Sequence, residues 1–148
     1  MSGLSIVGSS RNNGEREEND FYPTPSFAVQ NLIDREKFIG NVYEPACGDG
    51  AISNVFINNG FDVYSTDLVD RGFGVGNVNF LDYKGQNYDN IITNPPFKYA
   101  LEFVEKAKKH ADKKVAMFLK TVFLESTSRY EMFMDKDFPL RSEEHTSE

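Results

Sequence analysis

The sequence contains very little cysteine, histidine or tryptophan. Its 148 residues include one Cys (Cys47), two His and no Trp. A single thiol excludes a disulfide within the chain, and two scattered His do not form a zinc motif, so we predict no bound metal. No run of about 18 apolar residues is present, and we therefore expect no membrane span. The N-terminus lacks the basic start and long apolar stretch of a secretory signal, so the cytoplasm is the expected compartment.

Positive charge is also scarce. The chain has 16 Lys and Arg against 23 Asp and Glu, a net charge of −7 at neutral pH. Proteins that bind nucleic acids usually carry a basic surface, so the charge gives no support for such a partner. The length suits one domain with a substantial core.

Three regions can be distinguished along the chain. Residues 1–20 are rich in Ser, Asn, Gly and Glu without hydrophobic periodicity, and we expect a flexible N-terminal arm. Residues 21–140 carry the patterns of a folded domain. The last eight residues, RSEEHTSE at 141–148, match the in-frame translation of a widely used sequencing adapter. We expect this tail to derive from the adapter and the natural gene to continue past Leu140, which would leave the domain C-terminally incomplete.

Strand-like and helix-like patterns alternate between these ends. Apolar segments bounded by Gly, Asn or Pro are typical of strands, and amphipathic segments are typical of helices. Their order predicts an α/β fold, a Rossmann-like three-layer sandwich with a mainly parallel sheet that is truncated after its fifth strand. The predicted strands are 41–46, 61–67, 78–82, 88–94 and 115–121, and the predicted helices are 25–33, 51–60, 98–114 and 126–134.

Polar side chains follow the carboxyl ends of four predicted strands. They are Glu44, Asp67, Asp82 and Asn94. The carboxyl ends of parallel strands meet at one edge of a sheet, where ligands bind at the topological switch point. We therefore expect these four residues to share one site.

The segment EPACGDG, residues 44–50, predicts a ligand loop. Gly48 and Gly50 allow a sharp turn and a close approach of the backbone to a ligand. Dinucleotide sites usually carry a third Gly and place a phosphate at the helix N-terminus. Here that Gly is absent, and Glu44 and Asp49 put negative charge where a phosphate would lie. An adenosine ligand with a cation and no phosphate, such as S-adenosylmethionine, fits better. The alternative is a plain strand-to-helix turn with a capping Asp.

Two further acids suit the rest of such a ligand. Asp67 can accept both ribose hydroxyls, as acids at this position do in nucleotide-binding α/β folds. Asp82 can accept from an adenine amino group while Phe80 or Leu81 flanks the ring. For both acids, a turn or helix cap is the alternative. We expect Cys47 to be a small residue in a tight loop, not a nucleophile.

The segment NPPF, residues 94–97, ends the fourth predicted strand, because proline cannot donate to a sheet ladder. A proline-terminated strand with a core phenylalanine would explain it alone. In company with EPACGDG and the two acids, however, the chain resembles the class I S-adenosylmethionine-dependent methyltransferases that methylate amino groups and carry (D/N)-P-P-(F/Y). DFYPTP, residues 20–25, is similar to the N-terminal motif of DNA adenine methyltransferases and their phage relatives. The resemblance covers about residues 20–134.

The resemblance implies roles for individual residues. Asn94 and Pro95 would accept hydrogen bonds from the target amine through a side-chain and a backbone oxygen, and Phe97 would stack on a planar substrate. Pro95 and Pro96 would keep both oxygens aimed. The implied catalytic set is Asn94, Pro95, Pro96 and Phe97. The implied cofactor-binding set is Tyr22, Pro23 and Thr24 at the methionine end, then Glu44, Pro45, Ala46, Cys47, Gly48, Gly50, Asp67, Leu68 and Asp82.

Three substrates use this motif: adenine in DNA, guanine in ribosomal RNA and glutamine in a protein. The N-terminal DFYPTP favours DNA adenine, flipped out of the duplex, in a bacterial or phage-infected cell. Two alternatives remain. The chain can be a truncated fragment that binds cofactor without turnover, or a nucleotide-binding enzyme of another kind such as a dehydrogenase. The absent third Gly and the presence of NPPF argue against the dehydrogenase.

Overall fold

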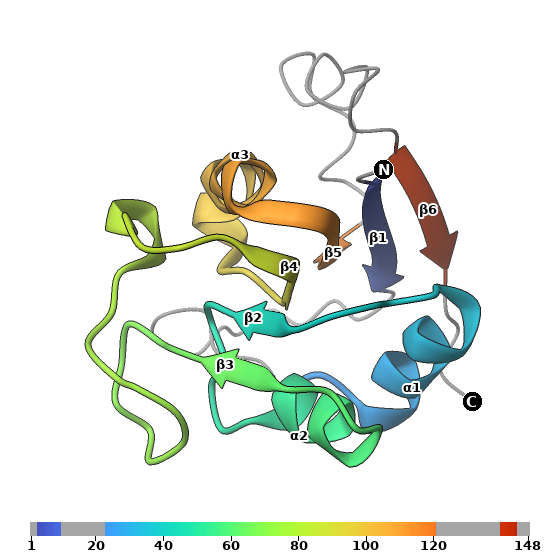
Figure 1. Ribbon diagram of the computed structural model, residues 1–148, viewed down its shortest axis with the longest axis horizontal. Helices are drawn as coiled ribbons and strands as arrows, with labels where there is room; N and C mark the ends of the chain where they lie inside the picture. Colours follow the sequence, from blue (N-terminus) through green and yellow to red (C-terminus); the bar gives the residue numbers. More distant parts are fainter. Residues whose placement is uncertain (1–2, 10–22, 121–139, 145–148) are drawn as a thin grey trace.

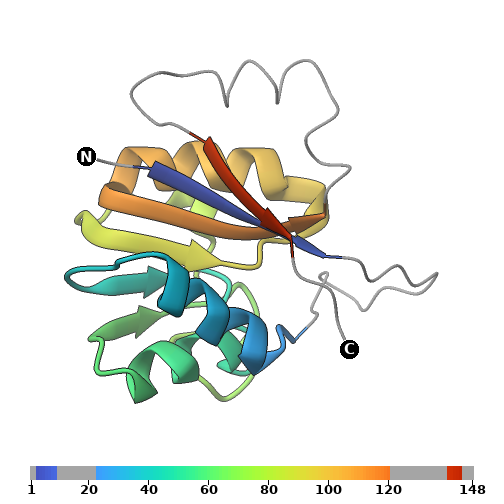
Figure 2. The ribbon, with the colours of Figure 1, turned by 90° about the vertical axis from the view of Figure 1, so that its right-hand side faces the viewer.

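The computed structural model describes residues 3–9, 23–120 and 140–144, with side chains over 23–119. A parallel sheet in the order β3-β2-β4-β5-β1-β6 forms its centre, and helices cover both faces (Figures 1 and 2). The strands are β1 (Gly3–Ser9), β2 (Val42–Glu44), β3 (Val63–Ser65), β4 (Tyr88–Thr93), β5 (Ala111–Lys120) and β6 (Leu140–Glu144). The helices are α1 (Ser26–Arg35), α2 (Ala51–Asn58) and α3 (Ala100–His110). The four neighbouring strands β3, β2, β4 and β5, with these helices, form an α/β domain consistent with a Rossmann-like fold.

Two apolar cores lie on opposite faces of the sheet. In β4, Ile91 points to the α3 side and Ile92 to the side of α1 and α2, because successive side chains of a strand alternate. In Figure 1, α3 lies above β4 and β5, whereas α2 lies below β3 and α1 lies to the right of β2 and β3. None of the helices in the described residues is long and apolar enough to cross a membrane. The α3 core includes Tyr43, Phe80, Phe103, Val104, Val115 and Met117, and the opposite core includes Val29, Leu32, Val42, Phe56, Ala116 and Phe118.

Four of the five predicted strands are confirmed as β2, β3, β4 and β5. The prediction for 78–82 was wrong, because Phe80–Asp82 forms a short 3₁₀ helix. Its cause is local: the Oδ1 atom of Asn79 accepts a hydrogen bond from the backbone N–H of Leu81 at 3.1 Å. Such a side-chain bond offers the backbone an alternative to a sheet ladder.

The helix predicted over 98–114 is shorter in the structure. Phe97–Tyr99 forms a 3₁₀ turn, and α3 ends at His110. The next four residues belong to β5, where Ala111 pairs with Tyr88 and Lys114 with Asn90 of β4. Ladder pairing with β4 thus overrides the favourable helix composition of this segment.

The sequence patterns did not predict two strands. β1 lies within the expected flexible arm, so that expectation is wrong for Gly3–Ser9, whose backbone pairs with β5 and β6. The unpaired backbone groups of an edge strand attract such an addition. β6 includes the first four residues of the expected adapter-derived tail and extends the sheet beyond the five strands we predicted. The origin of that tail stays a prediction, and the helix predicted at 126–134 lies outside the described residues.

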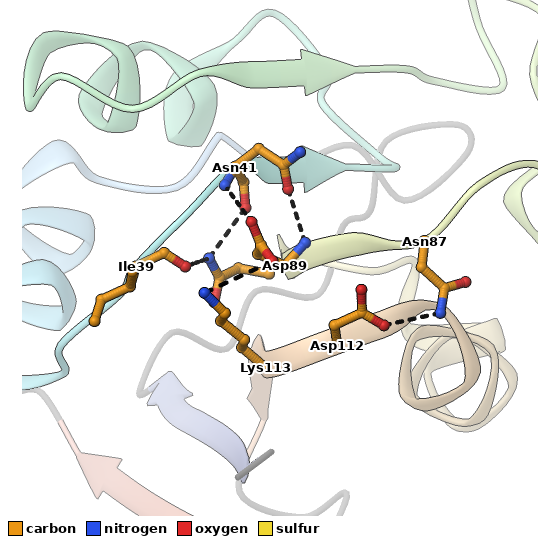
Figure 3. Close-up of polar contacts among 7 residues, drawn as sticks. Ile39, Asn41, Asn87, Asp89, Asp112 and Lys113 are labelled. Atoms are coloured by element: carbon orange, nitrogen blue, oxygen red, sulfur yellow. Dashed lines mark hydrogen bonds and ion pairs between the residues drawn. The ribbon is translucent and has the colours of Figure 1, made fainter.

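Polar side chains tie β2 to β4 at the amino edge of the sheet (Figure 3). The backbone N–H of Asp89 donates to Asn41 Oδ1 at 2.7 Å, and the backbone N–H of Asn41 donates to Asp89 Oδ2 at 3.0 Å. Asn90 Nδ2 donates to the carbonyls of Ile39 and Asn41. Lys113 of β5 pairs with Asp89 at 3.8 Å. We call this group, Ile39, Asn41, Asp89, Asn90 and Lys113, the amino-edge clasp.

Candidate functional site

A cavity of about 540 Å³ lies at the opposite, carboxyl edge of the sheet, beyond the ends of β2, β3 and β4. Three of the four polar residues predicted to meet there do so: Glu44, Asp67 and Asn94. Tyr22 lies outside the described residues. The predicted site residues that line the cavity are Pro23, Thr24, Glu44, Pro45, Ala46, Cys47, Gly48, Asp67, Leu68, Asn94 and Pro96, whereas Gly50, Asp82, Pro95 and Phe97 do not line it.

The glycine turn is held by hydrogen bonds that its backbone N–H groups donate to the segment after β3. The N–H of Gly48 donates to Asp67 Oδ2 at 2.8 Å, and the N–H of Cys47 donates to the carbonyl of Thr66 at 2.9 Å. Gly50 has a φ of 97°, and a Cβ added there would lie 2.7 Å from the ring of Phe73. Gly50 therefore shapes the turn without lining the cavity, as the requirement for a sharp turn predicted.

Glu44 is the most deeply buried acid of the site, with 1 % of its surface exposed. Its Oε1 accepts from the backbone N–H of Ser53 at 3.1 Å and from the Ser53 hydroxyl at 2.5 Å. Its Oε2 accepts from Thr93 Oγ1 at 3.3 Å. These donors are all neutral, and burial raises the pKa of Glu44 from its ordinary value of 4.5 to about 8, with nearby Asp67 adding to the rise.

The raised pKa of Glu44 changes the charge expected at the glycine loop. We expected Glu44 to bring negative charge to the glycine loop. With its raised pKa, the carboxyl of Glu44 holds a proton at neutral pH until a positive group approaches. The exposed Asp49 lines the same cavity.

Cys47 is buried beside the same loop. Burial, together with Glu44 and Asp67, raises the pKa of its thiol to about 12. Its sulfur lies 3.6 Å from the carbonyl oxygen of Phe73, as an S–H donor would. A thiol that stays protonated at neutral pH is a poor nucleophile, which agrees with a structural position in a tight loop.

The two acids predicted to hold ribose and adenine lie in different surroundings. Asp67 is 9 % exposed, and its oxygens accept from the backbone N–H groups of Gly48 and Val69 at 2.8 and 2.9 Å. Each carboxylate oxygen keeps a second lone pair for a ligand. Asp82 is exposed, lies outside the cavity and contacts Asn79 at 3.4 Å. The structure therefore does not bring Asp82 to the site, because the 3₁₀ turn that replaces the predicted strand directs it to the surface.

The NPPF loop follows β4 directly. Asn94 Nδ2 donates to the hydroxyl oxygen of Thr24 at 3.1 Å. The carbonyl of Pro96 accepts from the N–H of Tyr99 at 2.9 Å, which turns the chain into α3. Pro95 is buried, and Phe97 is half-buried at the start of the 3₁₀ turn.

Several cavity residues escaped the sequence analysis. Lys98 and Tyr99 directly follow NPPF, so proximity to the motif was a usable signal. Arg71 comes from the irregular 68–78 loop, which has no periodicity to indicate an orientation. Phe80 and Leu81 line the cavity, as expected for residues that flank a ring. The lining residues outside the predicted set are Ala51, Ile52, Arg71, Val78, Asn79, Lys98, Tyr99 and Phe103, together with Asp49, which the sequence analysis placed in the ligand loop without a binding role.

Comparisons with protein-family profiles, with curated proteins and with solved structures found no match. The geometry of the cavity is therefore the basis for assigning a function. That geometry combines a buried carboxyl with neutral partners, an acid that holds a glycine loop, and an amide beside two prolines. Such a set can bind a polar ligand that carries a positive group and can hold a second molecule by its amine.

Proposed function

We propose that this chain is the core of an S-adenosylmethionine-dependent methyltransferase that modifies an exocyclic amine, that of adenine in DNA. The observation that carries the proposal is the position of Asn94. It ends β4 at the wall of the cavity that Glu44, Gly48 and Asp67 also line. A ligand loop and an amine-accepting motif thereby face one space at the carboxyl edge of a parallel sheet, the usual place for ligands in this class of fold.

The cavity suits this cofactor in size and charge. A volume of about 540 Å³ lies within the range of pockets for small molecules. The cationic groups of S-adenosylmethionine would favour ionisation of Glu44, whose described hydrogen-bond partners are neutral. Asp67 can accept from ribose hydroxyls with its second lone pairs, and the buried Phe80 offers an apolar wall for a ring. When bound, the cofactor would supply a methyl group on a sulfonium.

The residues of the chain would act mainly on the target amine. The lone pair of an exocyclic amine is delocalised into the ring, so the amine is a poor nucleophile. Acceptors that bind both amine protons favour a more tetrahedral nitrogen. The side-chain oxygen of Asn94 and the backbone carbonyl of Pro95 are the two acceptors we propose, held by a rigid loop. Phe97 stays a predicted stacking surface for the substrate.

The choice of DNA over RNA or protein is supported by the N-terminal DFYPTP motif, and the net charge of −7 does not favour it. The basic segment that runs from the end of α3 into β5 lies at the amino edge, where Lys113 and Lys114 of β5 pair with Asp89 and Glu36. We propose nucleic-acid contacts from Arg71 and Lys98, because both of these cations line the cavity. Guanine in RNA and glutamine in protein remain the other substrates to assay.

Asn94→Ala tests the proposal. We expect this variant to lose methyl transfer to unmethylated DNA from a methylation-deficient bacterium while it binds sinefungin, a cationic analogue of the cofactor, as tightly as the parent. Transfer is measured with tritiated S-adenosylmethionine and binding by calorimetry. Asn54→Ala, an exposed position on α2, is the matched control and should change neither quantity.

Two results would change the conclusion. Near-full transfer by Asn94→Ala would refute the role given to its carboxamide. Sinefungin binding by the parent chain without transfer to DNA, RNA or protein would favour the alternative of a fragment that binds cofactor and lacks turnover.

A further inference from the structure

Thr24 and Asn94 are 70 residues apart in the sequence and meet at the wall of the cavity. Asn94 Nδ2 donates to Thr24 Oγ1 at 3.1 Å. Thr24 is 8 % exposed, so little water competes for its hydroxyl. Both residues line the cavity. The loop that precedes α1 thereby supplies a partner for one end of the Asn94 carboxamide.

The prolines of NPPF remove the usual way of orienting an asparagine. An Asn side chain often accepts a hydrogen bond from the backbone N–H two residues ahead, in an Asx turn. At Asn94 that position is Pro96, and the intervening residue is Pro95; neither has an N–H. The orientation of the carboxamide therefore depends on other elements, and the loop with Thr24 is one of them.

Orientation matters because the two ends of a carboxamide differ chemically. Oδ1 accepts hydrogen bonds and Nδ2 donates them, although the two ends have nearly the same shape. An amine substrate needs an acceptor at this position, since a donor would meet its own N–H groups. A partner that binds Nδ2 leaves Oδ1 at the opposite end of the group.

We propose that Thr24 is a positioning residue that holds the carboxamide of Asn94 with Oδ1 toward the amine of the substrate. The inference rests on the proposed function and adds to it a role for the N-terminal loop in the transfer step. An aspartate at position 94 has two equivalent oxygens and leaves no orientation to select. The need for the Thr24 hydroxyl should therefore disappear in an Asn94→Asp background.

The experiment uses the 148-residue chain with Thr24→Val, which keeps the shape and removes the hydroxyl, and Thr24→Ser, which keeps the hydroxyl. Transfer of tritiated methyl groups to unmethylated DNA gives kcat and KM, and calorimetry gives the Kd of sinefungin. We expect Thr24→Val to lower kcat about tenfold, the effect of one neutral hydrogen bond, with a smaller effect on the Kd, which reports the cofactor contact that the resemblance implies for Thr24. Thr24→Ser should restore most of the rate. In the Asn94→Asp background, Thr24→Val should leave kcat unchanged.

Each other outcome overturns the inference in a recognisable way. A weaker Kd for sinefungin with an unchanged kcat would make Thr24 a cofactor contact only. A tenfold loss that persists in the Asn94→Asp background would show a general structural role. A parent chain that transfers no methyl group to DNA, RNA or protein would refute the proposed function first, and the role of Thr24 with it.

Discussion

The buried carboxyl of Glu44 predicts an unusual dependence of stability on pH. Its pKa rises from 4.5 to about 8 on folding, so between these values the folded chain holds a proton that the unfolded chain has lost. An acid with a raised folded pKa stabilises the fold fully below its unfolded pKa and loses that contribution as the pH rises through the folded pKa. Stability should therefore fall from about pH 4.5 to pH 8, the reverse of the usual behaviour of carboxylates.

The magnitude follows from the shift. At about 1.4 kcal/mol per pKa unit, the whole window corresponds to about 5 kcal/mol, and the part between pH 5.5 and 7.5 to about 2 to 3 kcal/mol. Other groups contribute their own slopes. The pKa of His110 is lowered, chiefly by burial, which makes stability rise with pH near its ordinary value of 6.5. The thiol of Cys47, with a pKa of about 12, does not titrate in this range.

The assay compares the parent chain with Glu44→Gln. The amide can accept from Ser53 with its oxygen and donate to Thr93 Oγ1 with its nitrogen, and it does not titrate. The free energy of unfolding is measured in urea at half-unit steps from pH 5.5 to 7.5, without ligand. The contribution of His110 to the free energy of unfolding is common to both proteins and cancels in their difference. Relative to Glu44→Gln, the parent should lose about 2 to 3 kcal/mol over this range.

A control variant and a clear contrary result complete the test. Glu105→Gln, an exposed position on α3, should run parallel to the parent at every pH. If the Glu44→Gln and parent curves also stay parallel within about 0.5 kcal/mol, an uncertainty typical of extrapolated unfolding energies, Glu44 does not carry the proton we assign to it.

Two further changes give measurable effects. Gly40→Ala should lower the free energy of unfolding by about 3 kcal/mol or more, because the added Cβ would lie 2.0 Å from Asp89 Oδ2 and the backbone has a φ of 100°. Gly60→Ala is the control, because Gly60 has a φ of 91° and an added Cβ would meet nothing within 4 Å; we expect it to cost only the backbone term of about 1 kcal/mol. If urea titrations gave Gly40→Ala and Gly60→Ala the same loss of unfolding free energy, the clash with Asp89 would be contradicted. Asp67→Ala should weaken sinefungin binding at least tenfold, since the N–H of Gly48 loses its acceptor; an unchanged Kd by calorimetry would exclude Asp67 from the ligand site.

Local patterns predicted much of the site, and the errors have both a local and a long-range cause. Gly48 and Gly50 indicated a turn because few other residues adopt its backbone, and the prolines after Asn94 marked the end of β4. Asp82 was misplaced because a single side-chain bond from Asn79 replaces the expected strand. Contacts such as that between Thr24 and Asn94 join distant parts of the chain, and no local pattern encodes them.

The strands β1 and β6 were missed for a related physical reason. β1 pairs with the edge of β5, and β6 pairs in turn with β1, so both pairings depend on the sheet that is already folded. Composition at 1–20 favoured an arm because Ser, Asn, Gly and Glu dominate it. The run Leu4, Ile6 and Val7 is too short to predict a strand unaided.

The amino-edge clasp has a consequence for the evolution of the protein. β2 and β4 share only two ladder pairs, Val42 with Asn90 and Tyr43 with Ile91, and the clasp reinforces them at the amino edge. Past Tyr43 the pairing ends, and the cavity begins where the two strands part. The clasp residues that reinforce the pairing thus lie at the opposite edge of the sheet from the residues that line the cavity. Substitutions in the carboxyl-edge loops can therefore explore new ligands while the clasp preserves the sheet.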